Sequence, residues 1–302
     1  MKKKTEGLSR LEQQIEEMNE TNPHSRNILL AFKAILLERK RLVEKGTCMS
    51  VDVSQIDRAR LQGGVPVCRQ MSLLHPDEPW EKIASAVIPS IANGFPDLAE
   101  ELGKIEAGIK NARILLKEYF TPFPELDDGL VRYWSATLGI SPEILRLVLI
   151  SILRPVLEMK ERAVADLLGD ISWNKGYCPI CGAFPDMAVI KDKTFQRLLH
   201  CSRCRHEWRF DRVLCPYCEH EGKEEGTPYF FVEGKERETA FACEECKRYI
   251  ITLNRVSDLA DYDFDVVSMG LTHLDVIMQE KGYVPAACTE WNDFGSSPSS
   301  VS

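Results

Sequence analysis

The chain has 302 residues, of which 44% are hydrophobic and 28% charged, and its net charge is -8. This length exceeds one ordinary domain, and the composition is that of a soluble protein with a packed core. The acidic total argues against a nucleic-acid-binding protein and against attraction to an anionic membrane surface, since both functions favour basic proteins.

The N-terminal part of the chain, 1–170, is expected to be helical. Apolar side chains recur at spacings of three and four from Leu8 to Met18, which is the pattern of one buried helix stripe, and Pro23 ends it. Ser141-Pro142-Glu143 is a typical helix start, with a hydroxyl cap, a proline in the first turn and an acid near the positive end of the dipole. The longest apolar run, 147–153, is far shorter than the ~20 residues of a membrane span, so no membrane insertion is expected. Further helices are predicted over 25–46, 78–93 and 141–157.

The residue pattern changes at Ser172, where short runs typical of β-strands and turn-forming residues replace the helical periodicity. Strands are predicted around 188–190, 207–210, 229–232 and 248–253. The predicted fold class is α+β. We expect an all-α helical domain at 1–170, two small rubredoxin-like or zinc-ribbon β modules at 171–212 and 213–256, a C-terminal helix at 257–284, and a disordered serine-rich tail at 285–302.

Eight of the eleven cysteines lie in four C-x-x-C pairs. No apolar signal segment follows the lysines of the N-terminus, so the expected compartment is the reducing cytosol. There such pairs favour metal binding over disulfides. The predicted metal ligands are Cys178, Cys181, Cys201, Cys204, Cys215, Cys218, Cys243 and Cys246.

The spacing of the pairs predicts how they combine. Successive pairs are separated by the segments 182–200, 205–214 and 219–242. The first segment has the length typical of zinc ribbons, roughly 15–20 residues, and the last is long enough for a hairpin. We therefore expect the first pair to join the second, and the third to join the fourth. The rival arrangement joins the second to the third and leaves the outer pairs to meet over a long loop.

The metal itself is left open by the sequence. Four thiolates suit one zinc or one iron ion per site. Either ion satisfies the same cysteine pattern, and the ion could be structural or redox-active.

Other residues near the pairs have ordinary expected roles. Glycine follows the first pair at Gly182, where it permits a positive φ, but the other three pairs have Arg205, Glu219 and Lys247 there, which predicts looser or more strained turns. The sequence has no recognisable catalytic or cofactor-binding motif, so we expect no catalytic residues and no enzyme. The neighbouring histidines are expected to lie outside the ligand sets; they are His200, His206 and His220. The cysteines outside the pairs are expected to be ordinary thiols; they are Cys48, Cys68 and Cys288. A basic stretch could contact an acidic partner; it consists of Arg203, Arg205, Arg209 and Arg212.

The motifs between residues 173 and 283 resemble those of the formate dehydrogenase accessory protein family, FdhE. The resemblance includes the segment Cys178-Pro179-Ile180-Cys181-Gly182, the run from Arg197 to Cys204, and the pairs that begin at Cys215 and Cys243. It implies a cytoplasmic, non-enzymatic assembly factor, chaperone-like in action, that is associated with iron binding and with the catalytic subunit of respiratory formate dehydrogenase. It also implies that the eight paired cysteines are the metal ligands.

Two other classes of protein are alternatives to the assembly factor. One is a rubredoxin-like iron electron carrier, which requires iron in at least one site. The other is a zinc-ribbon nucleic-acid-binding protein. Residues 171–253 contain 13 basic and 13 acidic side chains, and each zinc with four thiolates adds a charge of about -2. This balance disfavours nucleic acid as a partner.

Overall fold

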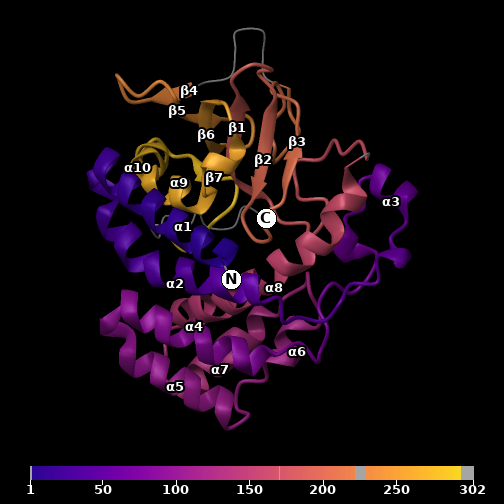
Figure 1. Ribbon diagram of the computed structural model, residues 1–302, viewed down its shortest axis with the longest axis vertical. Helices are drawn as coiled ribbons and strands as arrows, with labels where there is room; N and C mark the ends of the chain where they lie inside the picture. The colour runs from indigo at the N-terminus through magenta and orange to yellow at the C-terminus, as the bar shows by residue number, and fades with distance from the viewer. Residues whose placement is uncertain (1, 170, 222–228, 294–302) are drawn as a thin grey trace. The chain divides into compact units, whose positions relative to one another are not determined.

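The structure is a computed structural model that describes residues 2–169, 171–221 and 229–293. It divides into two compact units (Figure 1). The first holds most of the chain up to Ile171. The second holds most of the chain from Ser172 onward together with Gln14–Leu29. The expected α+β class, with helices first and a β region after them, is confirmed.

The N-terminal part is helical, as the apolar spacing predicts. Its helices are α1 (Lys2–Thr21), α2 (Arg26–Lys45), α3 (Arg58–Gln62), α4 (Trp80–Gly94), α5 (Ala99–Lys110), α6 (Leu116–Phe120), α7 (Asp128–Leu138) and α8 (Pro142–Leu168). The break between α1 and α2 falls at Pro23, as expected. The helices α3 and α7, whose N-caps are the aspartates Asp57 and Asp127, were not among the predicted elements.

The long helix α8 lies in the core of the first unit. Its predicted cap is present, because the Ser141 hydroxyl accepts a hydrogen bond of 3.1 Å from the N–H of Glu143. Its middle is apolar on nearly all sides, and Ile152, Leu153 and Val156 have no exposed surface. A buried ion pair joins Lys160 of α8 to Glu78, and loss of either partner would leave an uncompensated buried charge.

The β region forms one mixed sheet (Figure 1). Its strand order is β3-β2-β1-β6-β5-β4, and β7 also pairs with β6. The central strands β1 and β6 run parallel, while the hairpins on either side are antiparallel. The two predicted ribbons therefore share one sheet. The strands are β1 (Pro185–Lys191), β2 (Arg197–Cys201), β3 (Glu207–Arg209), β4 (Tyr229–Phe231), β5 (Glu238–Ala242), β6 (Arg248–Val256) and β7 (Val284–Pro285).

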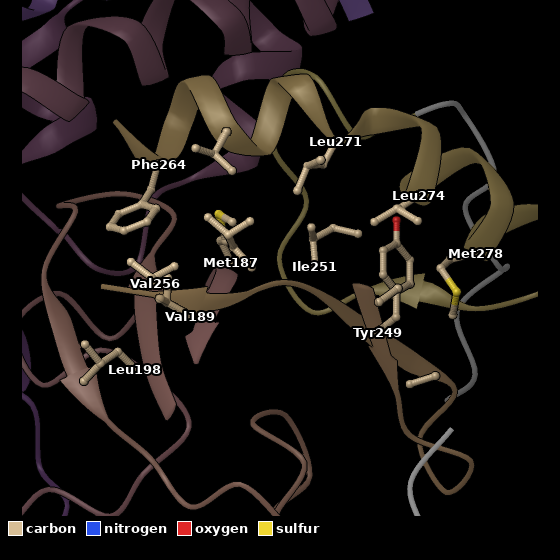
Figure 2. Packing of buried hydrophobic residues seen from close by; sticks show 14 residues of the cluster. Met187, Val189, Leu198, Tyr249, Ile251, Val256, Phe264, Leu271, Leu274 and Met278 are labelled. Carbon is tan, nitrogen blue, oxygen red and sulfur yellow. The ribbon is translucent and has the colours of Figure 1, made fainter. Parts of the chain in front are cut away.

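One face of this sheet is covered by two C-terminal helices, α9 (Phe264–Gly270) and α10 (Thr272–Glu280). Figure 2 shows Phe264, Leu271 and Leu274 pointing toward Met187 and Ile251 of the central strands. All five side chains are at most 2% exposed. This apolar contact between the helices and the sheet is the core of the second unit.

The C-terminal region differs in two details from the sequence-based expectation. A single helix was predicted, but Leu271 has φ -100° and ψ 14°, which ends α9 and starts α10. The tail up to Asp293 is packed, because Trp291 is 4% exposed and donates a 3.0 Å hydrogen bond to Ser268. The rest of the expected disordered tail, 294–302, lies outside the described residues.

The end of α1 and the turn after it belong to the second unit. The Ser25 hydroxyl donates a 2.8 Å hydrogen bond to the carbonyl of Gly270. A Cβ at Gly270 would lie 2.2 Å from the sulfur of Met18, so any larger residue at the end of α9 would displace the Met18 side chain. The segment Gln14–Leu29 is therefore part of the packing of this unit.

The buried Asp275 predicts a pH dependence of stability. One carboxylate oxygen accepts a 2.7 Å hydrogen bond from Tyr249, and the other has no partner among the described residues. Burial raises the pKa of Asp275 from 3.8 to about 7. The hydrogen bond from Tyr249 lowers the pKa and the charge of Asp186 raises it, but both effects are smaller than that of burial. Between these values the folded state holds a proton that the unfolded state has released, so stability falls as pH rises.

We expect Asp275→Asn to remove this dependence. From pH 5 to 7 the variant should gain about 1.4 kcal/mol per pH unit in free energy of unfolding relative to the parent chain. Above pH 7 the difference should level off. Urea unfolding at several pH values measures it, with the exposed Asp166→Asn as control. A difference that stays constant from pH 5 to 8 would contradict the raised pKa.

Candidate metal centres

The eight paired cysteines come together in two groups of four, combined as the spacing predicts. In each group, the four sulfur atoms all lie within 4.8 Å of one another. We call the first group centre 1 and the second centre 2. Centre 1 is Cys178, Cys181, Cys201 and Cys204, and centre 2 is Cys215, Cys218, Cys243 and Cys246.

Strand ends and hairpin turns position the thiols of centre 1. The first pair precedes β1, and the second pair starts at the last residue of β2, in the turn that leads to β3. Since β1 and β2 are antiparallel, with Pro185 opposite Cys201, their pairing brings the two C-x-x-C turns to the same end of the ribbon. In centre 2, the pair that starts at Cys243 likewise forms the turn between β5 and β6.

The separations between sulfur atoms fit a tetrahedral ion. They are 3.5 Å between Cys178 and Cys204, 3.7 Å between Cys215 and Cys246, and 3.7 Å between Cys218 and Cys243. Zinc–sulfur bonds of about 2.3 Å place two ligand sulfurs about 3.8 Å apart. Each centre could therefore hold one ion with four thiolate ligands. When bound, such an ion crosslinks the two turns or, if it is iron, exchanges an electron.

The backbone of each C-x-x-C turn curls around a sulfur. The N–H groups of Arg203 and Cys204 point at the Cys201 sulfur from 3.4 and 3.5 Å, and that of Tyr217 points at the Cys215 sulfur from 3.4 Å. The residue after each pair has a positive φ in all four turns. The angle is 73° at Gly182, but the other three positions hold residues with side chains, which adopt this conformation less readily than glycine does. Those values are 64° at Arg205, 58° at Glu219 and 55° at Lys247.

The thiols of centre 2 influence one another's ionisation. A hydrogen bond from the Cys246 thiol, helped by backbone N–H groups, lowers the pKa of Cys215 to about 5. The same hydrogen bond raises the pKa of Cys246, and burial raises that of Cys218. One thiolate thus forms readily in this group, and a cation favours ionisation of the remaining thiols.

Two residues beside centre 1 connect it to the rest of the second unit. His200 lies outside the sulfur group, as expected, and its Nδ1 is 3.2 Å from the Asp186 carboxylate. The Arg205 guanidinium bonds to Asp263 at 2.9 Å and also to Asp265. Arg205 was predicted as part of a basic stretch that could face an acidic partner, but its two carboxylate partners lie within the chain.

Arg197 is a buried residue whose role the sequence did not indicate. It is 2% exposed, and its guanidinium donates a 3.0 Å hydrogen bond to the carbonyl of Leu214, just before centre 2 begins. It also lies 4.6 Å from the centre of the Phe241 ring. Burial lowers the pKa of Arg197 to about 10. Its position at the start of β2 gave no signal, because that strand was itself not predicted.

The remaining cysteines and histidines lie outside both sulfur groups, as expected. Cys68 is buried, Cys48 is half-buried with its sulfur 3.5 Å from that of Met159, and Cys288 is exposed. His206 stacks parallel to Trp208 with ring centres 6.5 Å apart, and His220 is exposed. Each candidate ligand set therefore consists of four thiols.

Comparison with known proteins shows which proteins this chain resembles. The family model "FdhE, central domain" matches residues 177–212, which include all of centre 1. The chain is 26% identical to an FdhE homolog of Aquifex aeolicus, over 88% of this chain and 89% of the relative. It is 25% identical to the FdhE protein of Escherichia coli K12, over 91% and 84%.

A solved structure shows the same fold. The crystal structure of the FdhE protein from Pseudomonas aeruginosa matches with a TM-score of 0.60, covering 93% of this chain and 94% of that one at 20% identity. Together, the family model, the relatives and the fold confirm the resemblance to the FdhE family that the cysteine motifs indicate. Among the helices of the described residues, none has the length and apolar character needed to cross a membrane.

The geometry makes a direct prediction for Cys178. If its sulfur is a metal ligand, Cys178→Ser should lower the bound metal from two ions per chain to about one. It should also destabilise the second unit, because a structural zinc site contributes on the order of 10 kcal/mol to folding. Metal analysis and thermal unfolding measure both effects. The exposed Cys288→Ser is the matched control and should change neither. A Cys178→Ser chain with two ions and unchanged stability would show that Cys178 is not a ligand.

Proposed function

We propose that the chain is a cytoplasmic accessory factor for the maturation of respiratory formate dehydrogenase. In this proposal it acts as a chaperone without catalytic residues, binds the catalytic subunit of that enzyme, and holds one iron or zinc ion in each centre through the eight paired cysteines. The observation that carries the proposal is the pair of four-thiol centres in a fold that matches FdhE proteins over most of its length.

The sites themselves support an assembly role over a catalytic one. Each centre presents four thiols, so an ion held there has its four ligand positions filled by protein, whereas a catalytic metal site keeps a position open for substrate. Structural centres of this kind fix short strands and turns in place. A surface made rigid in this way is suited to recognising a protein partner by shape and by the polarity of its rim.

The proposal predicts a physical association. In cells that make formate dehydrogenase, the tagged chain should co-purify with the catalytic subunit of that enzyme. Cys243→Ala should greatly reduce the amount of that subunit recovered, because it removes one ligand of centre 2. Cys288→Ser should leave the recovery unchanged, and recovery is compared only among chains that circular dichroism shows to be folded. Failure of the folded parent chain to retain the catalytic subunit would overturn the proposal.

A rubredoxin-like electron carrier is the second candidate, because backbone N–H groups point at the sulfurs of Cys201 and Cys215. Such hydrogen bonds tune the reduction potential of iron–thiolate sites. This function predicts a coloured protein after anaerobic purification from its host, with iron in at least one centre and a reversible redox wave. A colourless chain that contains only zinc would exclude it.

A further inference from the structure

The two centres differ in their access to solvent. In centre 1 all four cysteines are at most 1% exposed. In centre 2, Cys215 is 4% and Cys243 is 6% exposed, but Cys246 is half-buried and Cys218 is exposed. A ligand from solution can therefore approach centre 2 from the side of Cys218, while the sulfurs of centre 1 are shielded.

The turns of the two centres also differ in how firmly they are anchored. Arg205, at the end of a centre 1 turn, bonds to Asp263 and Asp265, and the Asp265 side chain is fully buried. At the equivalent place in centre 2, Lys247 bonds to Glu244 of its own turn, and both side chains are more than half exposed. Solvent screens exposed ion pairs, so this pair restrains its turn less than the partly buried Arg205 pairs restrain theirs.

Strand pairing adds a third difference. The centre 1 pairs flank β1, β2 and β3, which form a continuous ladder with the middle of the sheet. The turn that carries Cys215 and Cys218 lies outside the named strands, and its flanks are joined by an isolated bridge between Leu214 and Glu221. Glu219, which follows Cys218, bonds to Lys175 through side chains that are both more than a third exposed. The turn that carries Cys218 therefore has less support from strand pairing than the turn of Cys201 and Cys204 has.

We propose that centre 2 is an exchangeable metal site, opened at Cys218, and that centre 1 retains its ion. This inference rests on the metal binding stated in the proposed function and adds a division of roles between the centres. In the exchange step, an incoming thiolate bonds to the ion as the bond from the ion to the Cys218 sulfur breaks. The released sulfur takes up the proton that the incoming thiol has lost. The oxidation state of the ion does not change.

Metal release tests the division directly. The purified full chain, loaded with two zinc ions, is mixed with an excess of the chelator 4-(2-pyridylazo)resorcinol, and zinc transfer is followed by absorbance. We expect two phases, each of one ion per chain, with rates that differ by at least about tenfold. Cys218→Ser should make the fast phase faster still, because the ion of centre 2 then has one thiolate fewer, and should leave the slow phase unchanged. Release of both ions at one rate would overturn the proposal.

Alkylation identifies the centre that opens, without relying on a variant. Iodoacetamide is added to the zinc-loaded parent chain, and labelled cysteines are located by mass spectrometry over time. Each event forms a bond from sulfur to carbon and releases iodide. Among the eight paired cysteines, Cys218 should react first and Cys246 next, with the free Cys288 as the reference for an exposed thiol. The centre 1 thiols should react only when the chain unfolds. Earlier labelling in centre 1 would overturn the proposal.

These measurements are independent of the client protein. A chain that binds two zinc ions and releases them as expected, but does not retain the formate dehydrogenase subunit, would contradict the maturation role and leave the exchange proposal standing. A chain that retains the subunit but loses both ions at one rate would do the opposite.

Discussion

Four sulfur atoms can surround one small cation only if two short backbone turns aim their side chains and their N–H groups at the same point. Each turn does so by placing the residue after the second cysteine in the left-handed region. At Gly182 this conformation is free of penalty, but at Arg205, Glu219 and Lys247 it costs on the order of 1 kcal/mol each. The free energy of binding an ion to the four thiols of a group would be large enough to offset this conformational cost.

The centres are held in one framework because the two ribbons share a sheet. The parallel contact between β1 and β6 places Met187 beside Ile251 and Val189 beside Leu253. The helices α9 and α10 cover these residues and complete a core to which both ribbons contribute. Arg197 adds a second link on β2, through its hydrogen bond to the carbonyl of Leu214. Neither ribbon is therefore an independent small domain, and the stability of one depends on the other.

The sequence predicted the local features well. The regular cysteine spacing was enough to foresee which pairs combine, because the segment between the first two pairs has the length of a ribbon hairpin. Apolar periodicity located α1, α2 and α4, the capping signal at Ser141 located α8, and β-branched or aromatic runs located β1, β3, β4 and β6. The strands β2 and β5 were missed, since Arg197 and His200 interrupt the apolar character of one and charged residues flank the other.

Features that depend on distant contacts were beyond the reach of the sequence. Nothing in the residues around β1 and β6 specifies that the two strands lie side by side. The inward direction of Arg205 depends on carboxylates that lie about sixty positions later in the chain, as the separations of 58 and 60 show. The difference in exposure between Cys204 and Cys218 likewise arises from what packs over each turn, since the C-x-x-C spacing is identical in both.

The order of the strands also governs when the protein can finish folding during its synthesis. Strand β1 can pair with β6 only after β6 has been synthesised. The middle of the sheet therefore stays unpaired until residues near Val256 have emerged from the ribosome. Closing such a long loop is slow compared with forming the local hairpins. The first ribbon therefore has an unpaired edge while residues 192–256 are synthesised, and an ion bound early at centre 1 would stabilise its hairpin until β6 is available.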